Sequence, residues 1–204
     1  MEAITIALAK GRLAEETIGL LEAVGVDCEE AKNPGRRLVL MDCTGAYRFI
    51  LVKPSDVPTY VDHGVADMGV AGKDTLMEEN RPLYELLDLG FGACRLCIAG
   101  DPAQHLCALH HDVYRVATKY PNIADNVFAA RGQNIEIIKL NGSVELGPLV
   151  GLSDVILDIV ESGDTLRANG LQVLEEICPV SARLVVNRVS LKTKSARIRA
   201  LVSA

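Results

Sequence analysis

Short apolar runs alternate with segments of helical periodicity along nearly the whole chain, and this alternation limits the possible fold more than any other feature. The apolar run 4–8 precedes a helical pattern over 13–24, where Gly25 is suited to end a helix. Near the end of the chain, the apolar run 155–160 precedes a helix start near Thr165. Strands separated by helices are typical of α/β domains with mainly parallel sheets. The sequence therefore predicts an α/β protein.

The core is expected to be aliphatic, because aromatic residues make up 4% of the chain and tryptophan is absent. Such strands suit sheets that are covered by helices on both faces. The strands that we expect span residues 4–8, 38–41, 49–52, 68–71, 83–89, 93–99, 113–117, 135–140, 155–160, 171–177 and 182–187. The helices that we expect span residues 13–24, 55–64, 122–131, 143–150 and 190–202, with further helix starts near residues 74 and 165.

A weak internal echo suggests two halves that are wound alike. The segment 64–76 resembles the segment 151–166, although the second is three residues longer. A chain of 204 residues has room for two small domains. We place the crossings between them near Gly90 and Pro179. This predicts one domain of residues 1–90 and 179–204 and a second of residues 91–178.

Charge and cysteine content exclude several classes of protein. A formal net charge of −6 does not suit a protein that coats nucleic acid. We find no secretion signal and no apolar run long enough to span a bilayer, so we expect a cytoplasmic protein. Cys94 and Cys97 form the single C-x-x-C, but their odd spacing sends the two side chains to opposite faces of a strand. We interpret the six cysteines as reduced thiols.

The segment 155–169 is the strongest candidate for a binding site. Its strand is followed by a turn in which Gly163 lies between the hydroxyl groups of Ser162 and Thr165. Free backbone N–H groups where a helix begins favour a phosphate. Asp158, Glu161 and Asp164 would repel a bare phosphate, but they suit a ligand that also carries ribose hydroxyls and Mg²⁺. An ordinary strand–turn–helix junction is the alternative, because these residue types are common in turns.

Residues 158–166 resemble the phosphoribosyl-pyrophosphate loop of phosphoribosyltransferases, which typically ends in Thr/Ser-Gly-x-Thr-Leu. Further segments resemble the ATP phosphoribosyltransferases in particular, among them Lys10-Gly11-Arg12 and Gly142-Ser143-Val144-Glu145. The first motif of that family more often has proline where this chain has Ala9. The matching segments follow the family's order over nearly the whole chain: 8–13, 56–61, 64–74, 92–96, 117–122, 142–146 and 158–171.

The resemblance implies two doubly wound α/β domains with a central cleft, like type II periplasmic binding proteins. It implies a pentosyltransferase that condenses ATP with phosphoribosyl pyrophosphate to give N1-(5-phosphoribosyl)-ATP and pyrophosphate, the first step of histidine biosynthesis. Because the chain is short, it resembles the form that works with a regulatory subunit similar to histidyl-tRNA synthetase. A homodimer within a hetero-oligomer is implied, and so is Mg²⁺ that arrives with the substrate near Asp158 instead of at a fixed protein site.

The resemblance also implies roles for particular residues. The catalytic cations are expected to be Lys10, Arg12, Arg36 and Arg37, and they would meet polyphosphate. Solvated surface charges are the alternative, above all for Arg36 and Arg37. Phosphoribosyl pyrophosphate is expected on Asp158, Glu161, Ser162, Gly163, Asp164 and Thr165. ATP is expected on Lys10, Arg12, Gly72, Asp74 and Glu145. For Asp74 and Glu145, capping of a helix is an alternative or additional role.

Two other functions remain as alternatives. A solute-binding protein of the same architecture would have a secretion signal and no phosphate loop. A phosphoribosyltransferase for another base would share the loop at 158–166, but the segments at Lys10 and Glu145 argue against it. The basic segment at Lys192, Lys194, Arg197 and Arg199 is interpreted as a solvated face, with a docking surface as the alternative.

Overall fold

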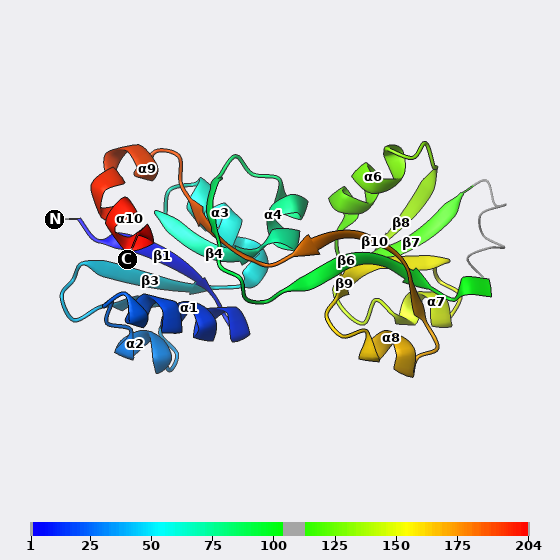
Figure 1. Ribbon diagram of the computed structural model, residues 1–204, viewed down its shortest axis with the longest axis horizontal. Coiled ribbons are helices and arrows are strands. Elements are labelled where there is room, and N and C mark those ends of the chain that lie inside the picture. The colour runs from blue at the N-terminus through cyan, green and yellow to red at the C-terminus, as the bar shows by residue number, and fades with distance from the viewer. Residues whose placement is uncertain (1, 104–112, 204) are drawn as a thin grey trace. The chain divides into compact units, whose positions relative to one another are not determined.

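The computed structural model describes residues 2–103 and 113–203 and divides the chain into two compact units (Figure 1). Unit 1 consists of Met1–Gly92 and Ser181–Ala204, and unit 2 consists of Ala93–Val180. The chain thus passes between units after Gly92 and again after Val180, in each case two residues later than the sequence led us to expect. None of the described helices is long and apolar enough to cross a membrane.

The described residues of unit 1 form a six-stranded mixed sheet. Its strands lie in the order β2 (Val39–Met41), β3 (Tyr47–Val52), β1 (Ile4–Ala9), β4 (Met68–Gly72), β11 (Ala182–Val186) and β5 (Tyr84–Asp88). β1 pairs in parallel with β3 and β4, whereas β2, β11 and β5 join the sheet in antiparallel pairings. β11 comes from the C-terminal segment, so unit 1 is complete only when the chain has returned from unit 2.

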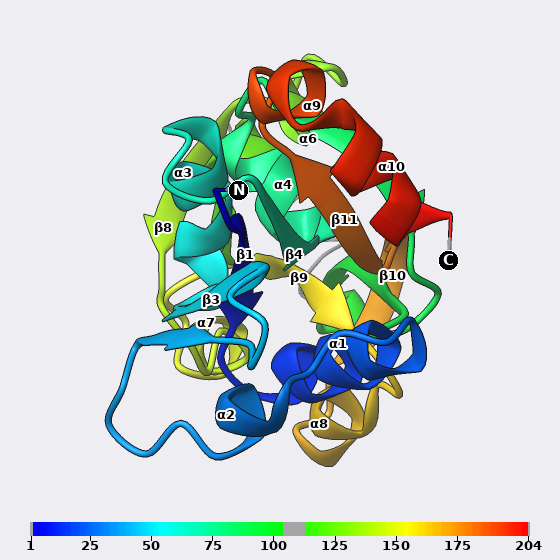
Figure 2. The ribbon, with the colours of Figure 1, turned by 90° about the vertical axis from the view of Figure 1, so that its left-hand side faces the viewer.

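Helices cover both faces of this sheet, as the aliphatic strands predicted. One face packs against α1 (Arg12–Ala23), α2 (Glu29–Lys32) and α10 (Ser195–Val202), with Ile18, Phe49 and Ile198 in one cluster. The other face packs against α3 (Val57–Asp62) and α4 (Lys73–Glu79). A 3-10 turn (Pro54–Asp56) precedes α3, and α9 (Ser190–Thr193) leads from β11 to α10, as Figure 2 shows in red.

The described part of unit 2 forms a five-stranded mixed sheet. Its strands lie in the order β10 (Gln172–Val180), β6 (Cys94–Gly100), β9 (Val155–Val160), β7 (Tyr114–Thr118) and β8 (Ile135–Lys139). In Figure 1, α6 (Pro121–Ala129) lies on one side of this sheet, and α7 (Leu146–Leu149) and α8 (Asp164–Ala168) lie on the other. Leu166 of α8 packs with Ile156 and Val160 on the latter face.

The two sheets repeat one topology, which gives the sequence echo a structural basis. Five neighbouring strands of unit 1, β3-β1-β4-β11-β5, correspond in order to the strands of unit 2, β8-β7-β9-β6-β10. In both runs the first two pairings are parallel and the last two are antiparallel. Asp67 and Asp154 occupy equivalent places. Asp67 accepts the backbone N–H of Thr5 at 2.8 Å, and Asp154 accepts that of Arg115 at 2.8 Å. Each aspartate thereby fixes the register of a central parallel pair.

Three expectations about secondary structure were wrong. The sheets are not mainly parallel, because β11 and β6 enter each sheet in antiparallel pairings on both sides. The helix expected over 143–150 is confined to Leu146–Leu149, because Ser143 has a left-handed backbone with φ of 48°. The basic helix expected over 190–202 is broken at Lys194, whose φ of −114° is not helical.

Candidate active site

The loop between β9 and α8 is where the two repeats differ. Asp67 lies seven positions before Asp74, whereas Asp154 lies ten positions before Asp164. β4 runs directly into α4, but Glu161, Ser162 and Gly163 are inserted between β9 and α8. Gly163 has φ of 77°, which glycine adopts at little cost. The extra residues turn a tight junction into an open loop.

Hydrogen bonds hold this loop together. The Ser162 hydroxyl donates to one carboxylate oxygen of Asp164 at 2.6 Å, and the Asp164 backbone N–H donates to the Ser162 Oγ at 3.3 Å. The guanidinium of Arg167 pairs with the other Asp164 oxygen and donates to the carbonyl of Ser162 at 3.1 Å. The hydrogen bond from Ser162, followed by that from Arg167, lowers the pKa of Asp164. Asp164 is therefore an anion in this loop at neutral pH.

The remaining expected loop residues lie at the end of β9. Strand alternation places Asp158 on the same sheet face as Ile156 and Val160, and one of its carboxylate oxygens accepts the Ile159 N–H at 2.8 Å. Glu161 and Thr165 are exposed. The structure thus brings all six expected sugar-phosphate residues into one strand end and turn.

In unit 1, a pocket of about 550 Å³ lies between α1 and the segment after α2. Lys10 and Arg37 both line it, together with Gly11 and Gly35. Arg37 pairs with Glu30 at 3.0 Å, whereas Lys10 has no ion-pair partner in the described part of the chain. Arg12 and Arg36 are exposed but are not among the lining residues. Two of the four expected cations therefore share this pocket.

Gly72, Asp74 and Glu145, which are also expected on ATP, lie where the helices α4 and α7 begin. Gly72 ends β4 and occupies the N-cap position of α4, so Asp74 lies in the first helical turn and is not the N-cap. Glu145 is half-buried at the N-cap position of α7, but its side chain makes no capping hydrogen bond. Capping therefore does not account for either carboxylate.

Sequence reasoning missed one residue that contacts the loop after β9, Arg167. Its position three residues after Asp164 is a helical pairing signal that was available in the sequence. Thr118, which ends β7, is fully buried. Its hydroxyl donates to the Leu157 carbonyl at 2.6 Å and accepts the Tyr120 N–H at 2.8 Å. Thr118 therefore fixes the end of β7 beside β9.

The described residues contain no group of three or more His, Cys, Asp or Glu side chains that could hold a metal ion. The four histidines of the sequence include His63, which ends α3, while His105, His110 and His111 lie outside the described residues.

The two-unit arrangement defines the class of protein. A periplasmic VFT2 domain of Bordetella pertussis BvgS matches it with a TM-score of 0.60 over 99% of this chain and 88% of that chain, at 16% sequence identity. At this low identity the match shows the fold alone, which is that of type II periplasmic binding proteins. This confirms the expected fold class.

The family follows from sequence comparison. The family model for ATP phosphoribosyltransferase (HisG) matches residues 53–204. ATP phosphoribosyltransferases of Lachnoclostridium phytofermentans and Bacillus cereus are 57% and 50% identical over all of this chain and 95% of theirs. The Thermotoga maritima ATP phosphoribosyl transferase (HisG:HisZ) complex contains a chain with a TM-score of 0.85 and 35% identity, over 98% of this chain and 95% of that one. The chain belongs to the ATP phosphoribosyltransferase family, which carries out the first step of histidine biosynthesis.

Proposed function

We propose that the chain transfers the phosphoribosyl group of phosphoribosyl pyrophosphate to N1 of ATP, with the loop after β9 holding the sugar phosphate. The observation that carries this assignment is the insertion of Glu161, Ser162 and Gly163 into one of two otherwise repeated junctions. The family membership of the chain supports it.

We assign phosphoribosyl pyrophosphate to Asp158, Glu161, Ser162, Gly163, Asp164 and Thr165. The backbone N–H groups of the turn and the hydroxyls of Ser162 and Thr165 would donate to the 5-phosphate. The carboxylates of Asp158 and Glu161 would accept hydrogen bonds from the ribose hydroxyls. The left-handed Gly163 supports this reading, because it turns the chain without placing a side chain over the turn.

We assign polyphosphate to the basic residues of unit 1. Lys10 and Arg37 line one pocket, and Lys10 and Arg36 have no ion-pair partner in the described part of the chain. Arg12, two residues after Lys10, begins α1. These cations would stabilise the departing pyrophosphate and the ATP phosphates, while Gly72, Asp74 and Glu145 would position the remainder of ATP.

The reaction requires placement more than proton transfer. Adenine N1 carries a lone pair and needs no proton removed before it attacks the anomeric carbon. Positive charge develops on the ribose ring as pyrophosphate leaves. The carboxylates of Asp158 and Glu161 would face the positive ring, and the cations would face the negative leaving group.

Mg²⁺ is proposed as part of the substrate. Carboxylates and phosphate oxygens are ligands that Mg²⁺ prefers, and it commonly binds through one or two carboxylates plus substrate phosphates. Asp158 and Glu161 at the end of β9 fit that donor set. Mg²⁺ would shield the pyrophosphate charge.

We also propose that the chain works with a regulatory subunit. The Thermotoga maritima structure is a HisG:HisZ complex, and the present chain covers 95% of its matched chain. We infer a HisZ-like partner, similar to histidyl-tRNA synthetase, with a homodimer of this chain inside the hetero-oligomer. The described cysteines are free thiols, which supports a reducing compartment such as the cytoplasm.

The test is turnover of purified chain with ATP, phosphoribosyl pyrophosphate and Mg²⁺, with and without the regulatory subunit. We expect phosphoribosyl-ATP, detected by its absorbance and by mass spectrometry. Orotate, hypoxanthine and adenine are offered as competing acceptors. Turnover of one of these bases, without any ATP product even when the regulatory subunit is present, would contradict the assignment.

A further inference from the structure

Arg167, Ser162 and Asp164 form a ring of contacts in the loop between β9 and α8, which we call the sugar-phosphate loop (residues 161–165). The two terminal nitrogens of Arg167 bind different parts of the loop, the Ser162 carbonyl at 3.1 Å and the Asp164 carboxylate. The other oxygen of Asp164 accepts the Ser162 hydroxyl at 2.6 Å. One side chain thereby ties the first half of the turn to the start of α8.

The arginine in this ring reduces the negative charge of the loop. Asp158, Glu161 and Asp164 place three carboxylates where an anionic sugar phosphate must bind. Arg167 offsets the charge of the carboxylate that lies within the turn itself. The planar guanidinium suits this task, because its fork of donors reaches a carbonyl and a carboxylate at once.

Comparison of the two repeats provides a second observation. Asp74-Thr75-Leu76 in unit 1 corresponds to Asp164-Thr165-Leu166 in unit 2, so the counterpart of Arg167 is Met77. Unit 1 has neither the inserted loop nor the arginine. The arginine is therefore present in the repeat that has the open loop, and methionine takes its place in the repeat where β4 runs directly into α4.

We propose that Arg167 is a positioning residue for phosphoribosyl pyrophosphate, acting through Ser162 and Asp164; this rests on the proposed function. It holds the Ser162 carbonyl away from the ligand, so that the N–H groups of the turn face the phosphate. It also holds the Asp164 carboxylate in place within the loop and offsets its charge.

The Arg167–Asp164 pair is suited to a clean test. The two side chains are 65% and 75% exposed, and exposed ion pairs contribute little to stability. Substitution of Arg167 therefore changes the loop while the fold persists. Asp164→Asn provides the partner change for a double-mutant cycle.

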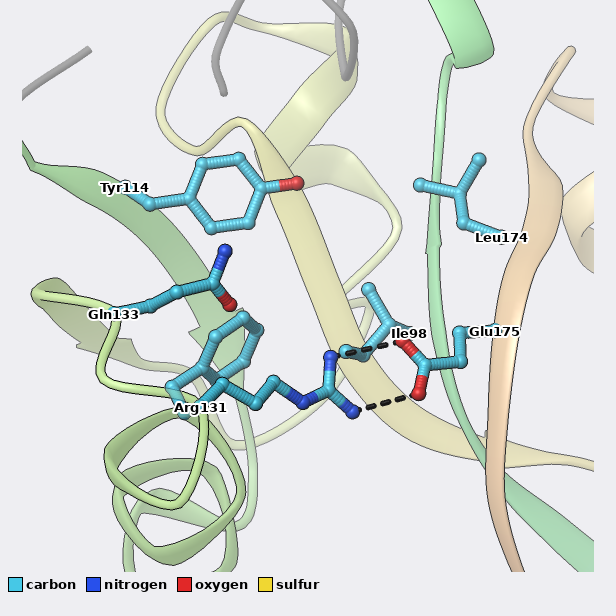
Figure 3. Close-up of a pocket in the computed structure, with 7 residues that line it drawn as sticks. Ile98, Tyr114, Arg131, Gln133, Leu174 and Glu175 are labelled. Atoms are coloured by element: carbon cyan, nitrogen blue, oxygen red, sulfur yellow. Dashed lines mark hydrogen bonds and ion pairs between the residues drawn. The ribbon is translucent and has the colours of Figure 1, made fainter. Parts of the chain in front are cut away.

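A matched control exists in the same unit. Arg131 makes a two-pronged ion pair with Glu175, with distances of 2.8 and 2.7 Å. Figure 3 shows this pair beside a pocket of about 330 Å³, which Tyr114 and Gln133 also line. Tyr114 begins β7, whereas the sugar-phosphate loop follows the end of the parallel strand β9. Arg131 thus resembles Arg167 in chemistry but lies at the opposite end of the sheet.

The experiment measures binding of phosphoribosyl pyrophosphate by calorimetry and steady-state kinetics for both substrates, using the chain together with its regulatory subunit. Arg167→Met, which copies the residue of unit 1, should raise the Kd for phosphoribosyl pyrophosphate about tenfold or more. The KM for ATP and the melting temperature should stay near those of the wild type. Arg167→Lys should restore part of the affinity, and Arg131→Met should leave it unchanged.

The double variant distinguishes a shared loop function from independent effects. Adding Asp164→Asn to Arg167→Met should cost less affinity than the two single changes summed, because both break one ring of contacts. Unchanged affinity in Arg167→Met, in an enzyme that still forms phosphoribosyl-ATP, would refute the positioning role and leave the proposed function intact. Wild-type enzyme that does not bind phosphoribosyl pyrophosphate would overturn both.

Discussion

At the scale of single residues, Gly11 forms the turn that lies between the basic residues Lys10 and Arg12. Its φ of 99° and ψ of −157° lie in a backbone region that is essentially restricted to glycine. This conformation turns the chain from β1 directly into α1, so that Lys10 and Arg12 flank the turn. Both follow the carboxyl end of a parallel strand, which is where ligands bind in open α/β sheets.

The role of Arg12 can be tested by removing its guanidinium. Arg12→Ala should lower kcat/KM on the order of 100-fold, which is typical when one charge-stabilising donor is lost from an active site. The far-UV circular dichroism spectrum should be unchanged, because Arg12 is an exposed first residue of α1. Arg199→Ala, an exposed arginine of α10, serves as the control. Activity within twofold of wild type would remove Arg12 from the site.

Residue patterns indicate a candidate site most directly where one strand and its turn supply all the groups. The six residues from Asp158 to Thr165 are consecutive or nearly so, and their residue types indicate the chemistry. Arg37 and Lys10 are distant in sequence, and only the packing of α1 against the 31–37 segment brings them to one pocket. No periodicity in the sequence encodes that approach.

At the scale of elements, the C-terminal helices are tied to the central strands by Asp67. Burial alone would raise the pKa of this carboxyl, but hydrogen bonds from Ser190, Thr5 and Lys194 lower it below the ordinary value. Lys194 Nζ lies 2.9 Å from the Asp67 carboxylate and 3.2 Å from the Ala3 carbonyl. Arg197 of α10 donates to the Glu2 and Ala46 carbonyls. Lys194 and Arg197, two of the four cations in the basic segment, therefore connect the C-terminal helices to the rest of unit 1.

This tie predicts a pH-dependent loss of stability. Lys194→Met should lower the unfolding free energy at pH 7 by about 3 kcal/mol, because it leaves a buried carboxylate without its cation. The folded-state pKa of Asp67 is lowered, so its contribution is present above the unfolded-state value of about 3.9 and is lost as pH falls through the folded-state value. The difference between variant and wild type should therefore shrink below about pH 4. Urea unfolding at pH 7 and pH 3 measures both quantities.

Lys192→Met is the control for this change, because Lys192 is exposed on the neighbouring helix α9. It should alter stability by no more than about 0.5 kcal/mol. A difference for Lys194→Met that stays constant from pH 7 to pH 3 would show that Asp67 is not the group responsible.

Element boundaries were predictable where periodicity and end signals agree. The range Val155–Val160 of β9 matches the expected strand, and α1 matches to within one residue at each end. The helix expected over 143–150 failed because a left-handed Ser143 is not signalled by its residue type. Strand direction also failed, since an apolar run looks the same whichever way it pairs.

At the scale of the whole molecule, the first strand after each passage between units joins the interior of a sheet. β6 follows β5 along the chain but lies in the sheet of unit 2, and β11 follows β10 but lies in the sheet of unit 1. In unit 1, β11 lies between β4 and β5. In unit 2, β6 lies between β9 and β10. Unit 2 is one continuous segment, whereas unit 1 depends on the C-terminal residues for an interior strand.

This asymmetry predicts how excised pieces behave. Residues 93–180 should fold alone, because every described strand of their sheet lies within the segment. Residues 1–92 should not fold, because without β11 the strand β5 has no partner and Asp67 loses Ser190 and Lys194. Joining 1–92 to 181–204 by a short Gly/Ser linker should restore folding, since the Ala182 N–H already donates to the Phe91 carbonyl at 2.9 Å. Circular dichroism with urea titration tests all three pieces, and cooperative unfolding of 1–92 alone would contradict the account.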